Sequence, residues 1–216
     1  MRQITKKLTT GAAVGNAVCA AQQPLGAGAL TINGANATAG VATFPAAYAV
    51  SVTSNGNDST RTFTITGTDA AGNTVSQTIT GPNNTTVFTT LAFKTVTRVT
   101  ISAASVGTSI TVGFGSFAVT EPLPLDIHGR PDISLQVVVD TALGTPTWTI
   151  QQTLDNPFTS APGTMTWFDH PDVNMVAQVV NRQGNYAYVP AAVRLKINAT
   201  AGAATLTIIQ SGDNRA

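Results

Sequence analysis

Charged side chains are scarce in this sequence of 216 residues: Asp, Glu, Lys and Arg together make up 10% of it, against roughly a quarter in ordinary soluble domains. The net charge is +1, so the chain has no broad basic field of the kind that holds nucleic acid. A surface covered by Thr, Ser, Asn and Gln is weakly repelled from neighbouring molecules, because few charges must be desolvated on contact. This composition is typical of a protein that is packed in an assembly.

Cysteine and long apolar runs are scarce as well. The single cysteine, Cys19, excludes an intramolecular disulfide, so the fold depends on packing of the 43% of residues that are hydrophobic. No stretch reaches the roughly 18 apolar residues that a membrane helix needs. A nucleophilic role for Cys19 requires a partner histidine, but His128 and His170 lie far along the chain, in a different predicted domain. We therefore expect neither an enzyme nor a cofactor.

The N-terminal segment differs from the rest of the chain. Arg2, Lys6 and Lys7 precede a small apolar run that ends around Cys19, an order that resembles a secretory or lipoprotein signal. Thr, Gly and Asn interrupt this run, so we favour an extended arm over residues 1–28 that lies on a partner and orders on binding. The three basic residues are then candidate interface residues. This interpretation predicts that removal of the arm leaves two folded domains but abolishes assembly.

Period-two alternation dominates the remainder of the chain. Threonine alternates with large apolar residues in segments such as 61–66 (RTFTIT), which predicts strands with one buried face. No window shows a sustained helical stripe. One pattern occurs twice, as 98–103 (RVTISA) closed by 110–112 (ITV) and as 194–199 (RLKINA) closed by 206–208 (LTI). Each copy predicts two strands joined by a turn of small residues, and the repeat predicts two similar β-domains.

The sequence therefore predicts an all-β protein with two tandem antiparallel β-sandwich domains, of the jelly-roll or immunoglobulin-like kind, behind the N-terminal arm. The first domain covers residues 29–119 and the second covers residues 132–216. Between them, the segment 120–131 contains Pro122 and Pro124. Two prolines so close together favour a stiff extended linker and exclude a central strand.

A metal site is one hypothesis for this linker. Asp126 and His128 are two residues apart, so a strand would place both side chains on one face. His170, in the polar segment 169–172, would add a nitrogen donor if the two segments met, giving a site of mixed nitrogen and oxygen ligands. Aspartate beside proline or glycine is also common turn chemistry. We favour this structural interpretation and expect no bound metal.

Aromatic residues carry another hypothesis, a carbohydrate- or receptor-binding module. Trp148, Trp167, Tyr186 and Tyr188 would form a platform for sugars if they shared an exposed face. Trp148 alternates with apolar residues at strand spacing, so we assign it to the core. Trp167 is followed directly by Phe168, and one ring of such a pair must face outward on a strand. The exposed ring is either an interface anchor or a contact with the other domain, and Trp167 is the candidate interface residue.

Six segments resemble parts of a known group of proteins. They are residues 59–73 (STRTFTITGTDAAGN), 76–83 (SQTITGPN), 92–96 (AFKTV), 149–158 (TIQQTLDNPF), 167–170 (WFDH) and 192–195 (AVRL). These segments resemble β-rich structural proteins of tailed bacteriophages, which sit on the virion as head decoration or cement proteins or around the head–tail junction. The resemblance implies a major capsid protein, or portal and adaptor proteins, as partners, and it implies no catalytic residues.

We therefore expect a non-enzymatic virion protein, a homo-oligomer assembled in the host cytoplasm, that stabilises the capsid as a decoration protein through its arm and sheet edges. A collar, adaptor or spike protein at the head–tail junction is the first alternative. A carbohydrate- or receptor-binding module is the second, and a secreted or lipid-anchored β-protein cleaved near Cys19 is the third. Neither nucleic acid nor a membrane is expected as a partner.

Overall fold

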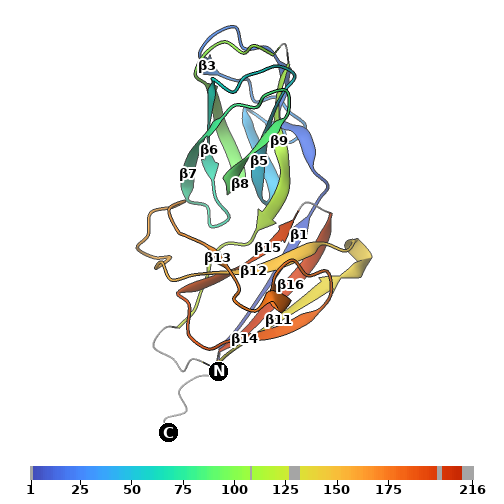
Figure 1. The fold of residues 1–216 in the computed structure, drawn as a ribbon, viewed down its shortest axis with the longest axis vertical. Coiled ribbons are helices and arrows are strands. Elements are labelled where there is room, and N and C mark those ends of the chain that lie inside the picture. Colours follow the sequence, from blue (N-terminus) through green and yellow to red (C-terminus); the bar gives the residue numbers. More distant parts are fainter. Residues whose placement is uncertain (1, 108, 127–131, 199–200, 211–216) are drawn as a thin grey trace. The chain divides into compact units, whose positions relative to one another are not determined.

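The computed structural model describes residues 2–107, 109–126, 132–198 and 201–210. Its regular structure is antiparallel β-sheet with two short 3-10 turns, so the predicted all-β fold is confirmed. The chain forms two compact units (Figure 1). We call the continuous one, Ala12–Ala118, the inserted unit, and we call the other, which combines Met1–Gly11 with Val119–Ala216, the split unit.

The inserted unit is built around one sheet in which β9, β5, β8, β6 and β7 lie side by side, with β2 on β9, β3 on β8 and β4 on β5. Its strands are β2 (Val14–Gln22), β3 (Gly28–Ala29), β4 (Ala37–Thr38), β5 (Val41–Ser54), β6 (Thr62–Thr68), β7 (Thr74–Thr80), β8 (Thr86–Ile101) and β9 (Ile110–Val119). The pairing of β5 with β8 shifts register between Thr43 and Tyr48. Pro45 lies inside this irregularity, because proline cannot donate a ladder hydrogen bond.

The core of the inserted unit follows the alternation seen in the sequence. Phe63 and Ile65 of β6 are fully buried, while the threonines beside them face outward. Phe44, Tyr48 and Phe114 form an aromatic group with ring centroids 4.3 to 6.1 Å apart. Burial of each large apolar side chain stabilises the fold by about 1.5–3 kcal/mol, so these residues hold the sheet together.

Residues 1–28 do not form the predicted free arm. β1 (Arg2–Thr10) runs antiparallel to β16 (Gly202–Gln210) in the split unit, and β2 pairs with β9 in the inserted unit. Three consecutive residues of β2, Ala17, Val18 and Cys19, are fully buried. Both strands therefore belong to the sheets. The prediction was wrong because the partner strands lie far away in the sequence, where a local pattern gives no sign of them.

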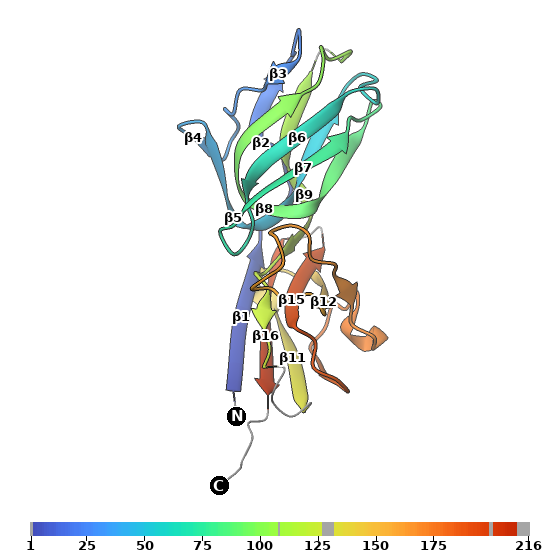
Figure 2. The ribbon, with the colours of Figure 1, turned by 90° about the vertical axis from the view of Figure 1, so that its left-hand side faces the viewer.

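The split unit contributes strands to two sheets. One sheet has the order β1-β16-β11-β14, and in the other β13 lies beside β12 and β12 beside β15, with β10 also on β15. Figure 2 shows β1, β16 and β11 side by side. The elements after β1 and before β16 are β10 (Leu123–Pro124), β11 (Ile133–Asp140), η1 (Thr141–Leu143), β12 (Thr147–Thr153), β13 (Phe168–Asp169), η2 (Val173–Met175), β14 (Arg182–Tyr186) and β15 (Ala192–Asn198).

Both sheets of the split unit carry buried apolar residues at alternate positions. Leu135 on β11 and Leu206 on β16 are buried in the first sheet, and Ile150 and Leu195 are fully buried in the second. Trp148 has no exposed surface, so its assignment to the core is confirmed. The strands were recognisable from sequence for the same reason, because alternate positions on a pleated strand face one side.

The predicted linker, residues 120–131, belongs to the split unit as far as it is described. Thr120 donates its backbone N–H to the Leu195 carbonyl (3.0 Å), and its hydroxyl accepts the Leu195 N–H (3.2 Å). Leu123 and Leu125 are buried, and β10 pairs with β15. The linker prediction was therefore wrong for this part, because the two leucines that alternate with the prolines fill a core. Residues 127–131 lie outside the described residues.

The repeated pattern forms strands in both copies, but the copies are not equivalent. Residues 98–101 end β8 and residues 110–112 begin β9, with β5 between these two strands in the sheet. Residues 194–198 lie on β15 and residues 206–208 on β16, in different sheets. Neither copy pairs its two strands with each other. The repeat therefore reflects the chemistry of half-buried strands rather than a duplicated arrangement.

Candidate functional site

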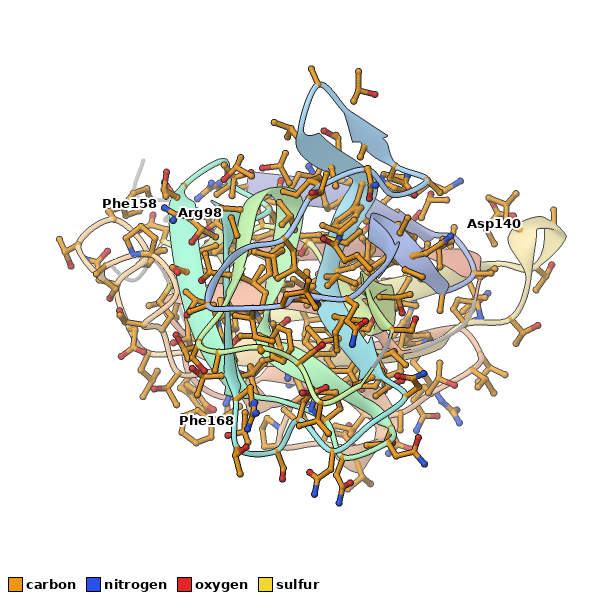
Figure 3. The ribbon with its side chains drawn as sticks, turned by 90° about the horizontal axis from the view of Figure 1, so that it is seen from above. Arg98, Asp140, Phe158 and Phe168 are labelled. Atoms are coloured by element: carbon orange, nitrogen blue, oxygen red, sulfur yellow. The ribbon has the colours of Figure 1, made fainter. Side chains whose placement is uncertain are left out.

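Loops of the split unit carry large apolar side chains that solvent reaches. Leu154 is 72% exposed, Phe158 is 80% exposed and Phe168 is 60% exposed. Leu154 directly follows β12, and Phe168 on β13 pairs with Gln152 near the end of the same strand. In Figure 3, Phe158 and Phe168 are labelled on the left-hand side of the view, well apart from each other, and Asp140 is labelled on the right-hand side. We call Leu154, Phe158 and Phe168 the apolar loop surface.

Polar side chains fix the turn that presents Phe158. Asn156 Oδ1 accepts the Phe158 N–H (2.9 Å), and the Asn156 carbonyl accepts the Thr159 N–H (3.2 Å). Asp155 Oδ2 accepts the Thr166 N–H (2.6 Å), which closes the base of the loop. Such bonds from Asn and Asp to the backbone are common turn chemistry. The turn is therefore held by its own residues while the Phe158 ring stays in solvent.

Trp167 covers an arginine of its own unit. The Arg194 guanidinium carbon lies 4.1 Å from the Trp167 ring centroid, a cation–π arrangement. Arg194 Nε donates to Gln151 Oε1 (2.9 Å), and Gln151 Nε2 donates to Asp169 Oδ1 (2.9 Å). Burial lowers the pKa of Arg194 to about 9, an effect that the Asp169 carboxylate opposes. Phe168 is the more exposed ring of the adjacent pair, and the interface role of Trp167 stays a prediction.

A second group, which we call the polar cluster, consists of Gln152, His170, Tyr186 and Tyr188. The His170 and Tyr186 rings lie 4.4 Å apart and the Tyr186 and Tyr188 rings 5.9 Å apart, measured between centroids. Gln152 Nε2 donates to the Tyr188 hydroxyl. Gln152, His170 and Tyr186 are at most 9% exposed, whereas Tyr188 is 41% exposed. Solvent therefore reaches the polar cluster at Tyr188.

Three atoms of the polar cluster are buried without a hydrogen-bond partner: Gln152 Oε1, His170 Nε2 and the Tyr186 hydroxyl oxygen. His170 Nδ1 accepts the Asp172 N–H (3.0 Å), so the neutral ring carries its proton on Nε2. The Asn185 backbone raises the pKa of His170. Among the described residues, however, no atom is placed to accept a hydrogen bond from His170 Nε2. A buried polar group without a partner costs about 1–3 kcal/mol. The cluster therefore has unused hydrogen-bonding capacity.

The charge state of the polar cluster follows from its burial. Burial lowers the pKa of His170 below its ordinary value, and the nearby Asp172 carboxylate opposes this shift. Burial also raises the pKa of Tyr186 above its ordinary value. Both side chains are therefore neutral near pH 7. Together with Gln152 they present hydrogen-bond donors and an acceptor beside aromatic rings, which is a combination that can bind a hydroxyl group.

Only part of the hypothetical metal site falls among the described residues. The Asp126 N–H donates to Gln210 Oε1 (2.9 Å), and Gln210 Nε2 donates to the Asp126 carbonyl (2.5 Å). His170 belongs to the polar cluster, and His128 lies outside the described residues. In the part of the chain that the structure describes, no three His, Cys, Asp or Glu residues are grouped to hold a metal ion.

Two of the three basic residues predicted at an interface form ion pairs within the split unit. Lys6 Nζ lies 2.5 Å from Glu121 Oε1, and Lys7 Nζ lies 2.9 Å from Asp140 Oδ2. Arg2 is exposed at the start of β1. The interface role of all three stays a prediction.

Cys19 lies fully buried on β2 of the inserted unit. Burial raises the pKa of its thiol to about 12, so the side chain remains protonated at neutral pH, and a thiol is a far weaker nucleophile than a thiolate. Among the described residues, no helix has the length and apolar character needed to cross a membrane.

Comparisons with known proteins assign no family to the chain. No family model matches it, and no curated protein matches it. Among solved structures it has a likeness to one titled "Crystal structure of infectious bursal disease virus VP2 subviral particle". That likeness has a TM-score of 0.20 and 11% sequence identity, and it covers 98% of this chain and 72% of that chain. A likeness at this level carries no argument about fold or function.

Proposed function

We propose that the protein is a non-enzymatic structural subunit of a tailed-bacteriophage virion, a decoration or cement protein that stabilises the capsid. The observation that carries the proposal is the apolar loop surface, whose three side chains are 60% to 80% exposed in a chain with only 10% charged residues. A contiguous exposed apolar patch marks an interaction site, and in this proposal the three side chains contribute to one contact surface. The proposal includes two tandem sandwiches of the jelly-roll or immunoglobulin-like kind, one in each unit.

Burial of the apolar loop surface on the major capsid protein would supply the binding energy. Each phenylalanine ring that is transferred from water contributes about 1.5–3 kcal/mol, and the low charge of the chain lowers the cost of desolvation. Arg194 stacks on the Trp167 ring, and Asp169, which follows Phe168 in sequence, accepts a hydrogen bond from Gln151, so both charged groups already have partners within the unit. Because these two charged groups are already bonded, the exposed phenylalanine rings are the groups that a partner would cover.

The test is binding of the purified protein to phage heads that lack it. We expect the double variant Phe158→Ser/Phe168→Ser to lose at least about tenfold in affinity and to keep its melting temperature, because both rings are exposed. Val106→Ser is the matched control, because Val106 is an exposed apolar residue (56%) in the inserted unit, and it should bind as the parent does. Unchanged binding of the double variant would contradict the proposal.

The location on the virion separates the decoration role from the collar, adaptor or spike role. Electron cryo-microscopy of the particle should show copies of the protein distributed over the capsid shell. Copies confined to one vertex would place the protein at the head–tail junction instead, and portal or adaptor proteins would then be its partners.

The polar cluster favours a second candidate, a carbohydrate- or receptor-binding module. Its unpaired donors and acceptor lie beside Tyr188, which is accessible from solvent, and aromatic rings with nearby polar groups bind sugars. The four aromatic residues of the hypothetical platform do not share an exposed face, because Trp148 and Tyr186 are buried. Titration with mono- and disaccharides, followed by the fluorescence of the protein and repeated with Tyr186→Phe, tests this candidate. No saturable change would remove it.

A further inference from the structure

β1 is a peripheral strand of the split unit. It pairs with β16 over nine residues, from Arg2 opposite Gln210 to Thr10 opposite Gly202, and no described strand pairs with its other edge. Along β1 only Leu8 and Thr10 are buried, whereas most residues of β16 are buried. β1 is therefore held mainly by its main-chain ladder, and it covers an edge of β16 that would otherwise be open.

Two ion pairs add to this ladder. They join Lys6 to Glu121 and Lys7 to Asp140, and among the described residues they are the two salt bridges present. Both carboxylates and the whole of β16 lie in the later segment of the split unit, Val119–Ala216. The same nine-residue ladder and the same two ion pairs can therefore form whether β1 comes from the same chain or from another copy.

The connection that leaves β1 is short and exposed. Gly11, Ala12 and Ala13 are all exposed, and a Cβ added at Gly11 would meet no atom within 4 Å. Beyond them β2 is fixed in the inserted unit, where Ala17 and Val18 are fully buried. Three residues span about 10 Å when extended. A terminal strand joined to the rest of the chain by a short hinge can be exchanged between copies, which is domain swapping.

We propose that β1 is exchanged between copies, so that β1 of one copy completes the four-stranded sheet of a second copy by pairing with β16 in the same register. The interaction surface is the β16 edge together with the carboxylates of Glu121 and Asp140. A second copy of this chain is the occupant that these features fit, because it supplies the matching ladder and places an ammonium group opposite each carboxylate. The exchange goes beyond the proposed virion role, since it depends only on contacts of the split unit.

Disulfide trapping in the full chain tests the exchange. Thr5 and Thr207 are directly opposed in the β1–β16 register, with Thr5 exposed and Thr207 half-buried, so cysteines there lie within bridging distance. A Thr5→Cys chain with one affinity tag is co-expressed with a Thr207→Cys chain that carries another tag, and the thiols are then oxidised. Exchange predicts a covalent heterodimer that carries both tags, with the bridge located between positions 5 and 207 by mass spectrometry.

Two controls make the outcome decisive. The double variant Thr5→Cys/Thr207→Cys reports the alternative, because β1 retained by its own chain closes the bridge within a monomer. Closure within monomers together with no heterodimer in the mixed sample would overturn the proposal. Gln183→Cys lies on β14, at the opposite edge of the same sheet, and should not bridge to Thr5→Cys. A heterodimer of equal yield with this partner would also overturn it, because the contact would then be unrelated to β16.

Discussion

The inserted and split units differ in how their buried polar groups are bonded. In the inserted unit Asp58 is fully buried, and its carboxylate accepts hydrogen bonds from the Ser54 hydroxyl (2.6 Å), the Val106 N–H (2.7 Å) and the Gly107 N–H (3.4 Å). In the split unit three buried atoms of the polar cluster have no partner. Fully bonded polar networks rigidify a fold, whereas unpaired groups need an explanation in terms of function, water or a ligand. Buried polar groups are therefore bonded around Asp58 in the inserted unit and partly unbonded in the polar cluster of the split unit.

Phenylalanine is also used differently in the two units. Phe44, Phe63 and Phe93 of the inserted unit are at most 1% exposed and Phe88 is 41% exposed, whereas Phe158 and Phe168 of the split unit are 80% and 60% exposed. The buried phenylalanines stabilise the inserted unit, whereas the two most exposed ones lie in the split unit. The same substitution of a phenylalanine should therefore change the stability of the two units by different amounts.

Deletion of residues 1–28 should have the largest effect, because it removes β1 from the split unit and β2 from the inserted unit. We expect both units to lose cooperative folding, because each loses a paired strand and the total stability of a typical domain is only about 5–15 kcal/mol. Hydrogen exchange followed by mass spectrometry measures this unit by unit. Deletion of residues 1–11 is the matched control and should leave the inserted unit protected. Protected amides in both units of the longer deletion would restore the free-arm interpretation.

Phe93→Ala and Phe168→Ala compare the same substitution in the two environments. Phe93→Ala should lower the free energy of unfolding by about 3–5 kcal/mol, because it leaves a cavity in the core. Phe168→Ala should change it by less than about 0.5 kcal/mol, because the ring is exposed. Urea denaturation followed by circular dichroism measures both values. Equal costs for the two variants would break the comparison.

Thr89→Val and Tyr186→Phe compare a paired buried hydroxyl with an unpaired one. The Thr89 hydroxyl accepts the Val50 N–H (2.9 Å) and donates to the Leu91 carbonyl (2.7 Å). Its loss should cost about 1–3 kcal/mol in the free energy of unfolding, because the Val50 N–H is left unpaired. Loss of the Tyr186 hydroxyl should cost nothing measurable by the same urea assay. A Tyr186→Phe cost as large as that of Thr89→Val would mean that the hydroxyl is bonded in solution.

His170 should give the split unit a modest dependence on pH. Burial lowers its pKa in the folded chain below the ordinary 6.5, so below pH 6.5 the unfolded chain binds a proton that the folded chain does not. The stability contribution is therefore complete above pH 6.5 and is lost as the pH falls through the folded pKa, with a slope of at most about 1.4 kcal/mol per pH unit. Unfolding of His170→Gln between pH 7 and pH 5 should show a flatter profile than His128→Gln. Identical profiles would mean that other groups set the dependence.

Local alternation was enough to predict much of the fold. The pattern of Thr62–Thr68 and of Ile133–Asp140 places apolar residues on one face, and both segments are strands with that burial. The sequence did not predict that β1 belongs to a sheet. Lys6 lies on the same, less exposed face of the strand as Leu8, so the alternation of apolar and polar residues is weak. Its partner, β16, is distant in sequence, and no local rule identifies such a pairing.

The candidate site was less predictable than the fold. Gln152 alternates with Trp148 and Ile150, and this spacing was a usable signal that a polar side chain faces inward. The burial of His170 was not visible, because it comes from Tyr186, a residue on a different sheet. A histidine next to proline has the appearance of turn chemistry, and only the tertiary contact shows that its ring is enclosed.

The division of the split unit also sets an order of events during synthesis. Thr10 and Gly202, whose side-chain hydroxyl and carbonyl meet at 3.1 Å, are separated by 192 positions. On the ribosome β1 therefore emerges long before β16, while the inserted unit is complete and can fold in the interval. During that interval the nascent β1 has no β16 of its own chain. On a polysome, the timing of translation thus offers the unpaired strand to neighbouring copies before its own sheet exists.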